Sequence, residues 1–470
     1  MPFLFKTILA VFFIMPLPFG SNRDWAWLLA AAVCFIMMTY WCFLFINGKT
    51  HLSLCLKKPI NIATLGLLSL LVCWIFIQSL PFPSVLLPEK TVDIYTQANF
   101  ALTGLKELQS TSISWDAGIT KMTALKSLFY LCIYFLLMQL IDSREKLKTF
   151  LSVVFVAGLF QAVYGSFMVW SGIEYLFGVK KQGYIGYATG TFVARNHFAG
   201  YLEMAVAFGI GRILLTNNKE KNIHYGHSWR SKLRKWLDRL YSKNALQAVA
   251  IMMMLYALVM SGSRMGNVAF FFSLLFSGII STLISPNFRA YGKKIVKFCS
   301  ASLVIIVIAG LLGWLKVADR IEKTDVHNES RFDVAASIVP MIHDFSWLGS
   351  GAGTFKYVFP GYITNNYCCF EHAHNDYLEI LSDMGYIGFV LLAGVVLISL
   401  YQAIVTIRHR HSRLVRTTGF VGIMATLSLL IHGFMDFNLH IPANALLFIA
   451  SLSLPSIGKA VYQKNNGLRK

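Results

Sequence analysis

Arginine, histidine and carboxylate or amide side chains gather in four short stretches of a chain that otherwise carries few charges. The stretches are Arg195, Asn196 and His197; Arg264 within Ser261-Gly262-Ser263-Arg264; Glu371, His372, His374, Asn375 and Asp376; and Asp436, Asn438 and His440. Arginine binds phosphate oxygens bidentately and keeps its charge at any relevant pH. A histidine can take the proton from an attacking hydroxyl. Together these residue types suit a transfer reaction on a phosphate-linked substrate.

The elements that must position these residues are apolar. Of the 470 residues, 56% are hydrophobic and 14% are charged, with a mean hydropathy of +0.58, whereas soluble chains average about 25% charged residues. Uncharged runs of membrane-spanning length recur along the whole chain, which excludes a soluble enzyme and a disordered protein. We predict an all-α polytopic membrane protein with about twelve spans: residues 7–22, 25–47, 59–80, 122–141, 149–172, 198–216, 245–262, 265–284, 298–315, 385–407, 417–435 and 441–458.

The first apolar run follows Lys6 as in a signal peptide. It is followed, however, by Gly20-Ser21-Asn22-Arg23 and at once by a second long run, so we expect a retained helix. With the N-terminus inside, most of the 42 Lys and Arg residues fall in inner segments and most of the 22 Asp and Glu residues in outer ones. This positive-inside pattern predicts that both termini are cytoplasmic. The net charge of +20 therefore reflects topology and not a nucleic-acid partner.

The predicted topology divides the chain into three parts. Residues 1–315 hold the first nine spans, with an outer loop at 81–121 and a basic, amphipathic inner loop at 217–244 that suits anionic lipid headgroups. Residues 316–384 form a large outer loop with a helix around 329–343, and residues 385–470 hold the last three spans and an inner tail. All four polar stretches then lie on the outer face, at headgroup depth.

Each candidate also has a structural explanation. Arg195 at a helix start can reach to the membrane interface without binding a substrate, whereas Arg264 lies in a turn too short to need a guanidinium. A single loop histidine is more often structural than catalytic. Glu203 lies on the helical face of Asn196 and either orients an arginine or is a buried, hydrogen-bonded acid.

Three further patterns carry little chemistry. The pair His372-x-His374 lacks a third ligand at an obvious spacing, so we expect no metal. The glycines of residues 349–353 (GSGAG) precede no GKS or GKT, so we interpret them as a turn. The adjacent Cys368 and Cys369 suit two loop thiols better than a strained disulfide, and no cofactor motif is present.

A polyprenyl-pyrophosphate glycan matches the predicted face, because its pyrophosphate lies at this depth with the lipid in the bilayer. Negative charge grows on the pyrophosphate as the glycosidic bond breaks, so fixed cations stabilise the transition state more than the ground state. The sequence therefore favours a glycosyltransferase that uses a pre-activated, lipid-linked donor. A transporter would place its ionisable residues near the bilayer midplane, where only Glu203 is expected.

At these residues the chain resembles the O-antigen ligase and polysaccharide polymerase superfamily. His374, Asn375, Gly385 and Gly388 in HNDYLEILSDMGYIG match the ligase pattern. The segments GTFVARNHFAGYLEM, SGSR and HGFMDFNLHIPANALLF, which hold Arg195, Arg264 and Asp436, resemble other segments of the family. The resemblance spans about residues 190–455.

The resemblance implies a GT-C-like fold in the bacterial inner membrane with a periplasmic active face. It implies metal-independent glycan transfer from undecaprenyl pyrophosphate to an acceptor sugar such as lipid A-core, with Arg195 and Arg264 on the pyrophosphate and His374 in acceptor activation. Further substrate-binding candidates are Asn196, His197, Asn375, Asp376, Asp436 and His440. Chain polymerases and protein O-oligosaccharyltransferases share the motif. The short tail after residue 458 counts against the protein-modifying branch.

Overall fold

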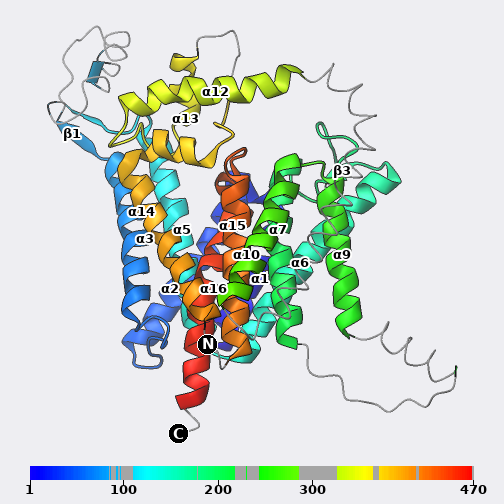
Figure 1. Ribbon diagram of the computed structural model, residues 1–470. Coiled ribbons are helices and arrows are strands. Elements are labelled where there is room, and N and C mark those ends of the chain that lie inside the picture. Colours follow the sequence, from blue (N-terminus) through cyan, green and yellow to red (C-terminus); the bar gives the residue numbers. More distant parts are fainter. Residues whose placement is uncertain are drawn as a thin grey trace.

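The computed structural model describes residues 1–83, 85, 92–93, 96, 110–176, 178–216, 229, 243–284, 325–363, 370–408 and 412–467. These residues form a bundle of long helices with a cap over one end (Figure 1). The helices are α1 (Pro2–Ile14), α2 (Asp24–Ile46), α3 (Pro59–Gln78), α5 (Ala117–Leu140), α6 (Arg144–Ser171), α7 (Arg195–Thr216), α9 (Lys243–Met260), α10 (Arg264–Ile284), α12 (Asp325–Asp344), α13 (Phe355–Val358), α14 (Asp376–Ile407), α15 (Arg413–His432) and α16 (Pro442–Gly467), with 3-10 turns η1 (Phe19–Ser21), η4 (Phe359–Tyr362) and η5 (Asn438–His440). Strand β1 (Pro81–Pro83) pairs with β2 (Ser110–Ser112), and β3 (Tyr175–Leu176) pairs with β4 (Val179–Lys180), both antiparallel.

Nine of the described helices are long and apolar enough to cross a membrane. Large apolar side chains such as Leu29, Ile36 and Phe43 of α2 are exposed on the outside of the bundle. In water such a surface would be unfavourable, but in a bilayer it faces hydrocarbon. The chain is therefore an all-α polytopic membrane protein, as the composition predicts.

Every predicted span that falls within the described residues contains a helix. The predicted span 298–315 lies outside the described residues, as does nearly all of the inner loop 217–244. The first span is shorter than predicted, because α1 ends at Ile14, before Pro16 and Pro18. Its 13 residues rise only about 20 Å, which is less than the roughly 30 Å of a hydrocarbon core.

The centre of the bundle is formed by α7, α15 and α16. Helix α15 packs against α7, α10, α14 and α16, and Phe198 and Phe208 of α7 and Phe420 of α15 are fully buried. Gly200 lets the last hairpin approach α7 closely, since a Cβ at this position would lie 2.4 Å from Oδ1 of Asn438. This contact places the turn between α15 and α16 against the first turns of α7.

The predicted outer loop folds as a cap over the end of the bundle where α7 and α14 begin (Figure 1). The helix expected around residues 329–343 is present within α12. It packs through Val334, Ile338 and Phe345 against Phe355 of α13 and Phe359 of η4. This small core holds the segment that leads into α14 over the end of the bundle.

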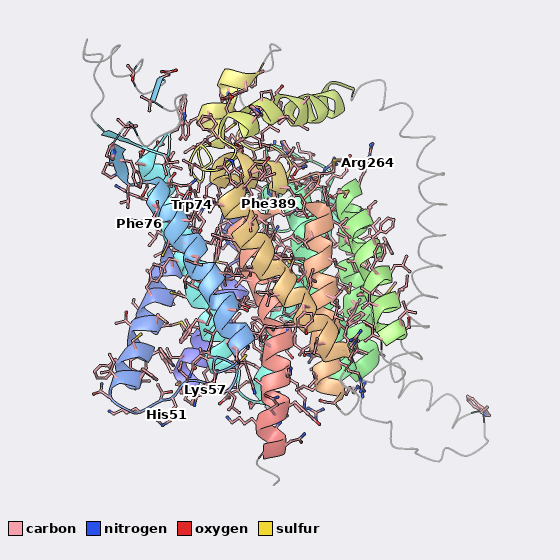
Figure 2. The ribbon with its side chains drawn as sticks, turned by 60° about the vertical axis from the view of Figure 1, so that its left-hand side comes forward. His51, Lys57, Trp74, Phe76, Arg264 and Phe389 are labelled. Carbon is pink, nitrogen blue, oxygen red and sulfur yellow. The ribbon has the colours of Figure 1, made fainter. Side chains whose placement is uncertain are left out.

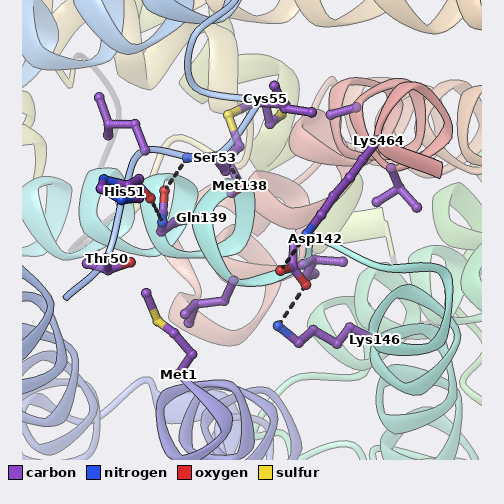
Figure 3. A pocket seen from close by; sticks show the side chains of 16 residues that line it. Met1, Thr50, His51, Ser53, Cys55, Met138, Gln139, Asp142, Lys146 and Lys464 are labelled. Atoms are coloured by element: carbon purple, nitrogen blue, oxygen red, sulfur yellow. Dashed lines mark hydrogen bonds and ion pairs between the residues drawn. The ribbon is translucent and has the colours of Figure 1, made fainter. Parts of the chain in front are cut away.

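The end of the bundle opposite the cap, which we predict to be the inner end, holds a cavity of about 280 Å³ (Figure 3). Asp142 lies there between Lys146 at 2.7 Å and Lys464 at 3.1 Å. Burial alone would raise the pKa of Asp142, but the two lysines lower it below its ordinary value. Figure 2 shows His51 and Lys57 at this end and Arg264 at the other, so the cavity is separate from the residues predicted to do chemistry.

Candidate functional site

A buried carboxylate lies at the centre of the capped end. Asp436, in the turn between α15 and α16, is 1% exposed. Its Oδ1 lies 3.6 Å from Nδ1 of His374, and its Oδ2 lies 3.8 Å from Nε2 of His197 and 4.0 Å from Nε2 of His432. The structure thus brings together three of the four polar stretches that the sequence singles out.

The three imidazoles stabilise the charge of Asp436. Burial alone would raise the pKa of this carboxyl group, but His197, His374 and His432 outweigh burial and hold the pKa below its ordinary value. Asp436 is therefore ionised at neutral pH. A fixed negative charge beside an imidazole stabilises the imidazolium that forms when the ring takes up a proton.

The loop that carries His374 is fixed on both sides. His374 has a φ of 50°, a left-handed conformation that few residues other than glycine adopt. The Asn375 side chain accepts hydrogen bonds from the first N–H groups of α14 and donates one to the carbonyl of Phe434 at 3.0 Å. The N–H of Asp376 donates to the carbonyl of Gly433 at 2.9 Å. Both residues, which we predicted to bind substrate, hold the loop on the hairpin.

Asp376 is further tied to the last hairpin by its side chain. Its buried carboxylate accepts a hydrogen bond from the N–H of Leu439 at 3.2 Å. In the first turn of α7, Asn196 is half-buried and His197 is buried, with the His197 ring edge-on to Phe437 at 4.6 Å. Glu371 is exposed beside the site, whereas Cys368 and Cys369 lie outside the described residues.

His372 and His440 face a different carboxylate from that of His374. Nδ1 of His372 lies 2.7 Å from Oε1 of Glu379, and Nε2 of His440 lies 3.4 Å from the same oxygen. Burial lowers the pKa of His440 to about 4, although Glu379 acts in the opposite direction. His372 and His374 do not act as a pair, because His374 faces Asp436. Instead, Glu379 of α14 and His440 of the last hairpin lie close to His372.

A second buried pair links α7 to α15 beneath Asp436. Oε1 of Glu203 lies 2.7 Å from Nδ1 of His432, and both side chains are buried. Of the two roles that the sequence left open for Glu203, this bond favours the buried, hydrogen-bonded acid. Gly266 of α10 packs next to the pair, since a Cβ there would lie 3.2 Å from Oε1 of Glu203.

Two arginines lie beside this site on neighbouring helix ends. The Arg195 guanidinium lies over the ring of Tyr187 at 4.4 Å and over that of Tyr184 at 5.6 Å, and its buried Nε has no hydrogen-bond partner among the described residues. Arg264 is exposed at the start of α10 (Figure 2). The turn before it touches the same group, because Gly262 approaches both Tyr187 and Arg195.

The glycines of the ligase-like motif shape the start of α14. At Gly385, φ is 65° and ψ is −173°, so the helix is broken there. A Cβ at Gly385 would lie 2.3 Å from the carbonyl oxygen of Trp347 and 2.6 Å from the N of Gly349. The expected turn at residues 349–353 is present and packs into this break, where Gly353 donates its N–H to Asp383 at 2.7 Å. The break separates a first segment that begins at Asp376 from the apolar segment that follows Gly385, where the sequence predicts the membrane span to begin.

Sequence reasoning missed four contributors to the site: Glu379, His432, Phe437 and Tyr187. Glu379 and His432 carry a usable signal, since each is a polar residue at the edge of an apolar run. Phe437 and Tyr187 carry none, because aromatic residues are common throughout this chain. Only the structure reveals their role, because it places the ring of Phe437 beside His372 and the ring of Tyr187 beside Arg195.

Comparison with known proteins finds a similarity over part of the chain. No curated protein matches the chain. The family model described as O-antigen ligase matches residues 249–393. This range is narrower than residues 190–455, over which we find the resemblance in the sequence. The matched residues include Arg264 and the motif from His374 to Gly388, whereas Arg195 and the last hairpin lie outside them. Residues 249–393 are therefore similar to the O-antigen ligase family.

Proposed function

We propose that the protein is an O-antigen ligase-like glycosyltransferase of the bacterial inner membrane. It transfers a glycan from undecaprenyl pyrophosphate to an acceptor sugar, lipid A-core, at the periplasmic face. The observation that carries this proposal is the pairing of His374 with the buried, ionised Asp436 at the same end of the bundle as Arg195 and Arg264. The similarity of residues 249–393 to the O-antigen ligase family supports the reaction class.

In the proposed reaction, the acceptor hydroxyl oxygen attacks the anomeric carbon of the donor glycan. The bond from that carbon to the pyrophosphate oxygen breaks, the hydroxyl proton passes to His374, and undecaprenyl pyrophosphate leaves. The imidazole of His374 is 29% exposed and its Nδ1 edge faces Asp436, which stabilises the imidazolium. His374 is thereby oriented as a general base.

Arg195 and Arg264 would stabilise the charge that grows on the leaving pyrophosphate. The stacking of Arg195 on Tyr187 fixes the guanidinium and leaves donors for phosphate oxygens. Because these two cations can neutralise the leaving group, we propose that the transfer step needs no metal ion at the pyrophosphate.

An apolar groove supports a lipid-linked donor. A cavity of about 240 Å³ between α14 and α15 has Asp376 and Gly433 at one end and continues past Ile380 and Phe389 to Leu400. Phe389 lies on the outer half of α14 (Figure 2). The groove thus leads from the polar site towards the middle of the bilayer, along the path that a polyprenyl chain would take.

Reconstitution tests the proposal. Purified protein in liposomes is given an undecaprenyl-pyrophosphate-linked glycan together with lipid A-core, and the products are separated by gel. We expect the glycan on lipid A-core and equimolar release of undecaprenyl pyrophosphate. Growth of the lipid-linked glycan in place of its transfer would identify a chain polymerase. No turnover of the donor with either acceptor would refute the proposal.

A further inference from the structure

Three ligand-type side chains from three separate segments meet beside the proposed transfer site. They are His372 in the loop before α14, Glu379 in the first turns of α14, and His440 at the end of η5. One ligand atom from each of the three side chains lies within 4.8 Å of the other two. The two contacts to Glu379 measure 2.7 and 3.4 Å.

The group is held in place by its surroundings. Glu379 is 2% exposed, and its second oxygen, Oε2, accepts a hydrogen bond from the N–H of Ala373 at 2.9 Å. The His372 ring stacks on Phe437 at 4.0 Å with an interplanar angle of 17°. The Glu379 carboxylate therefore has one oxygen fixed by the backbone and the other aimed at the two imidazoles, which is the orientation that a monodentate metal ligand needs.

Two imidazoles and one carboxylate are a donor set that suits Zn²⁺, with a coordination position left for water. Zinc bonds of about 2.0–2.2 Å at tetrahedral angles separate ligand atoms by roughly 3.3–3.5 Å, which is within the range of separations in this group. The side chains of His372 and His440 are 28% and 24% exposed, so an ion has access from the outer face. We propose that His372, Glu379 and His440 bind one zinc ion.

The zinc ion would stabilise the structure and would take no part in the transfer step. His374, only two residues from His372, turns away from this group towards Asp436. A zinc ion would join the loop before α14, the start of α14 and the last hairpin, and so hold both sides of the contact between His374 and Asp436. The site does not depend on the proposed function, because zinc is measured on the protein alone.

Zinc binding to the purified full-length protein tests this proposal. The protein is stripped with a chelator, titrated with ZnCl₂ by calorimetry, and its metal content is measured by elemental analysis after desalting. We expect one zinc ion per chain. His372→Gln and His440→Gln should each weaken zinc binding more than about tenfold, because each removes a ligand, and loss of a group that only hydrogen-bonds a ligand already costs about 10- to 100-fold in affinity.

Two matched variants control the result. His374→Gln changes a histidine in the same loop and His51→Gln changes one at the inner end, and both should retain one zinc ion. Because changes at Glu379 risk misfolding, Glu379→Asp is used with Co²⁺, whose visible absorption should weaken relative to the wild-type protein. Absence of stoichiometric zinc in the wild type, or equal loss of zinc from His374→Gln and His372→Gln, would overturn the proposal.

Discussion

Nδ1 of His374 lies 3.6 Å from Oδ1 of Asp436, although 62 residues of sequence separation and two membrane crossings stand between them. At this distance the two groups interact electrostatically and need only a small closure to form a hydrogen bond. The backbone of Asp376 fixes the separation, because its N–H donates to the carbonyls of Gly433 at 2.9 Å and of Asp436 at 3.2 Å.

His374→Gln should reduce transfer by about 10²–10⁴-fold, because glutamine cannot act as a base near neutrality. Asp436→Asn should also slow transfer, and the double variant should be no slower than His374→Gln alone, since the carboxylate acts through the histidine. Rates are measured in the reconstituted assay with His51→Gln as control. If the two losses multiply in the double variant, Asp436 does not act through His374.

Arg195→Ala and Arg264→Ala should each cost about 2–4 kcal/mol of transition-state stabilisation, roughly 30- to 1000-fold in rate. Substitution by lysine should restore activity only in part, because lysine keeps the charge and loses the planar fork. Lys180→Ala removes an exposed cation from the same outer face and should stay active. Near-normal rates for both alanine variants would contradict a role in holding pyrophosphate.

Gly385→Ala should lower the thermal unfolding temperature markedly. The residue has a φ of 65°, and a Cβ would lie 2.3 Å from the carbonyl oxygen of Trp347, so the combined strain should exceed about 2 kcal/mol. Gly394→Ala provides the control on the same helix, since its nearest contact is the flexible Leu67 side chain at 3.2 Å. Equal unfolding temperatures of Gly385→Ala and Gly394→Ala in detergent would show that the fold does not require the helix break at Gly385.

Glu203→Ala should destabilise the fold by about 1–3 kcal/mol, because it removes the carboxylate that is hydrogen-bonded to the buried imidazole of His432. Glu203→Gln keeps an acceptor for His432 and should cost less. Thermal unfolding of the purified variants measures both effects. A smaller loss for alanine than for glutamine would contradict the role of the pair between α7 and α15.

The orientation of the bundle predicts opposite labelling of its two ends. With accessible native cysteines replaced by serine, Lys356→Cys on α13 should react with an impermeant maleimide in intact cells. Lys57→Cys should react only after permeabilisation, because basic inner loops stay in the cytoplasm. Both residues are exposed in the folded chain. Reaction of both from the same side would refute the predicted topology.

The amino-acid sequence by itself predicted a membrane protein and located nearly all of the described helices. It also singled out the stretches that hold the arginines and histidines of the site. This follows because uncharged runs must form helices in a bilayer and because polar groups beside them are rare. It did not predict the helical segment of α14 that precedes the break at Gly385, since the buried Asp376, Glu379 and Asp383 interrupt the apolar pattern that marks a span. Hydropathy measures the free-energy cost of placing a residue in hydrocarbon. It takes no account of polar side chains that form hydrogen bonds with neighbouring helices.

Only the tertiary structure decided which histidine meets which carboxylate. His372 and His374 are two residues apart, yet the left-handed backbone at His374 directs one ring to Glu379 and the other to Asp436. Glu379 lies in α14, seven residues after His372. Asp436, by contrast, comes from the α15–α16 turn and reaches the loop because Gly200 lets that hairpin pack against α7. Pairings of this kind depend on how helices distant in sequence pack together, and no local spacing encodes them.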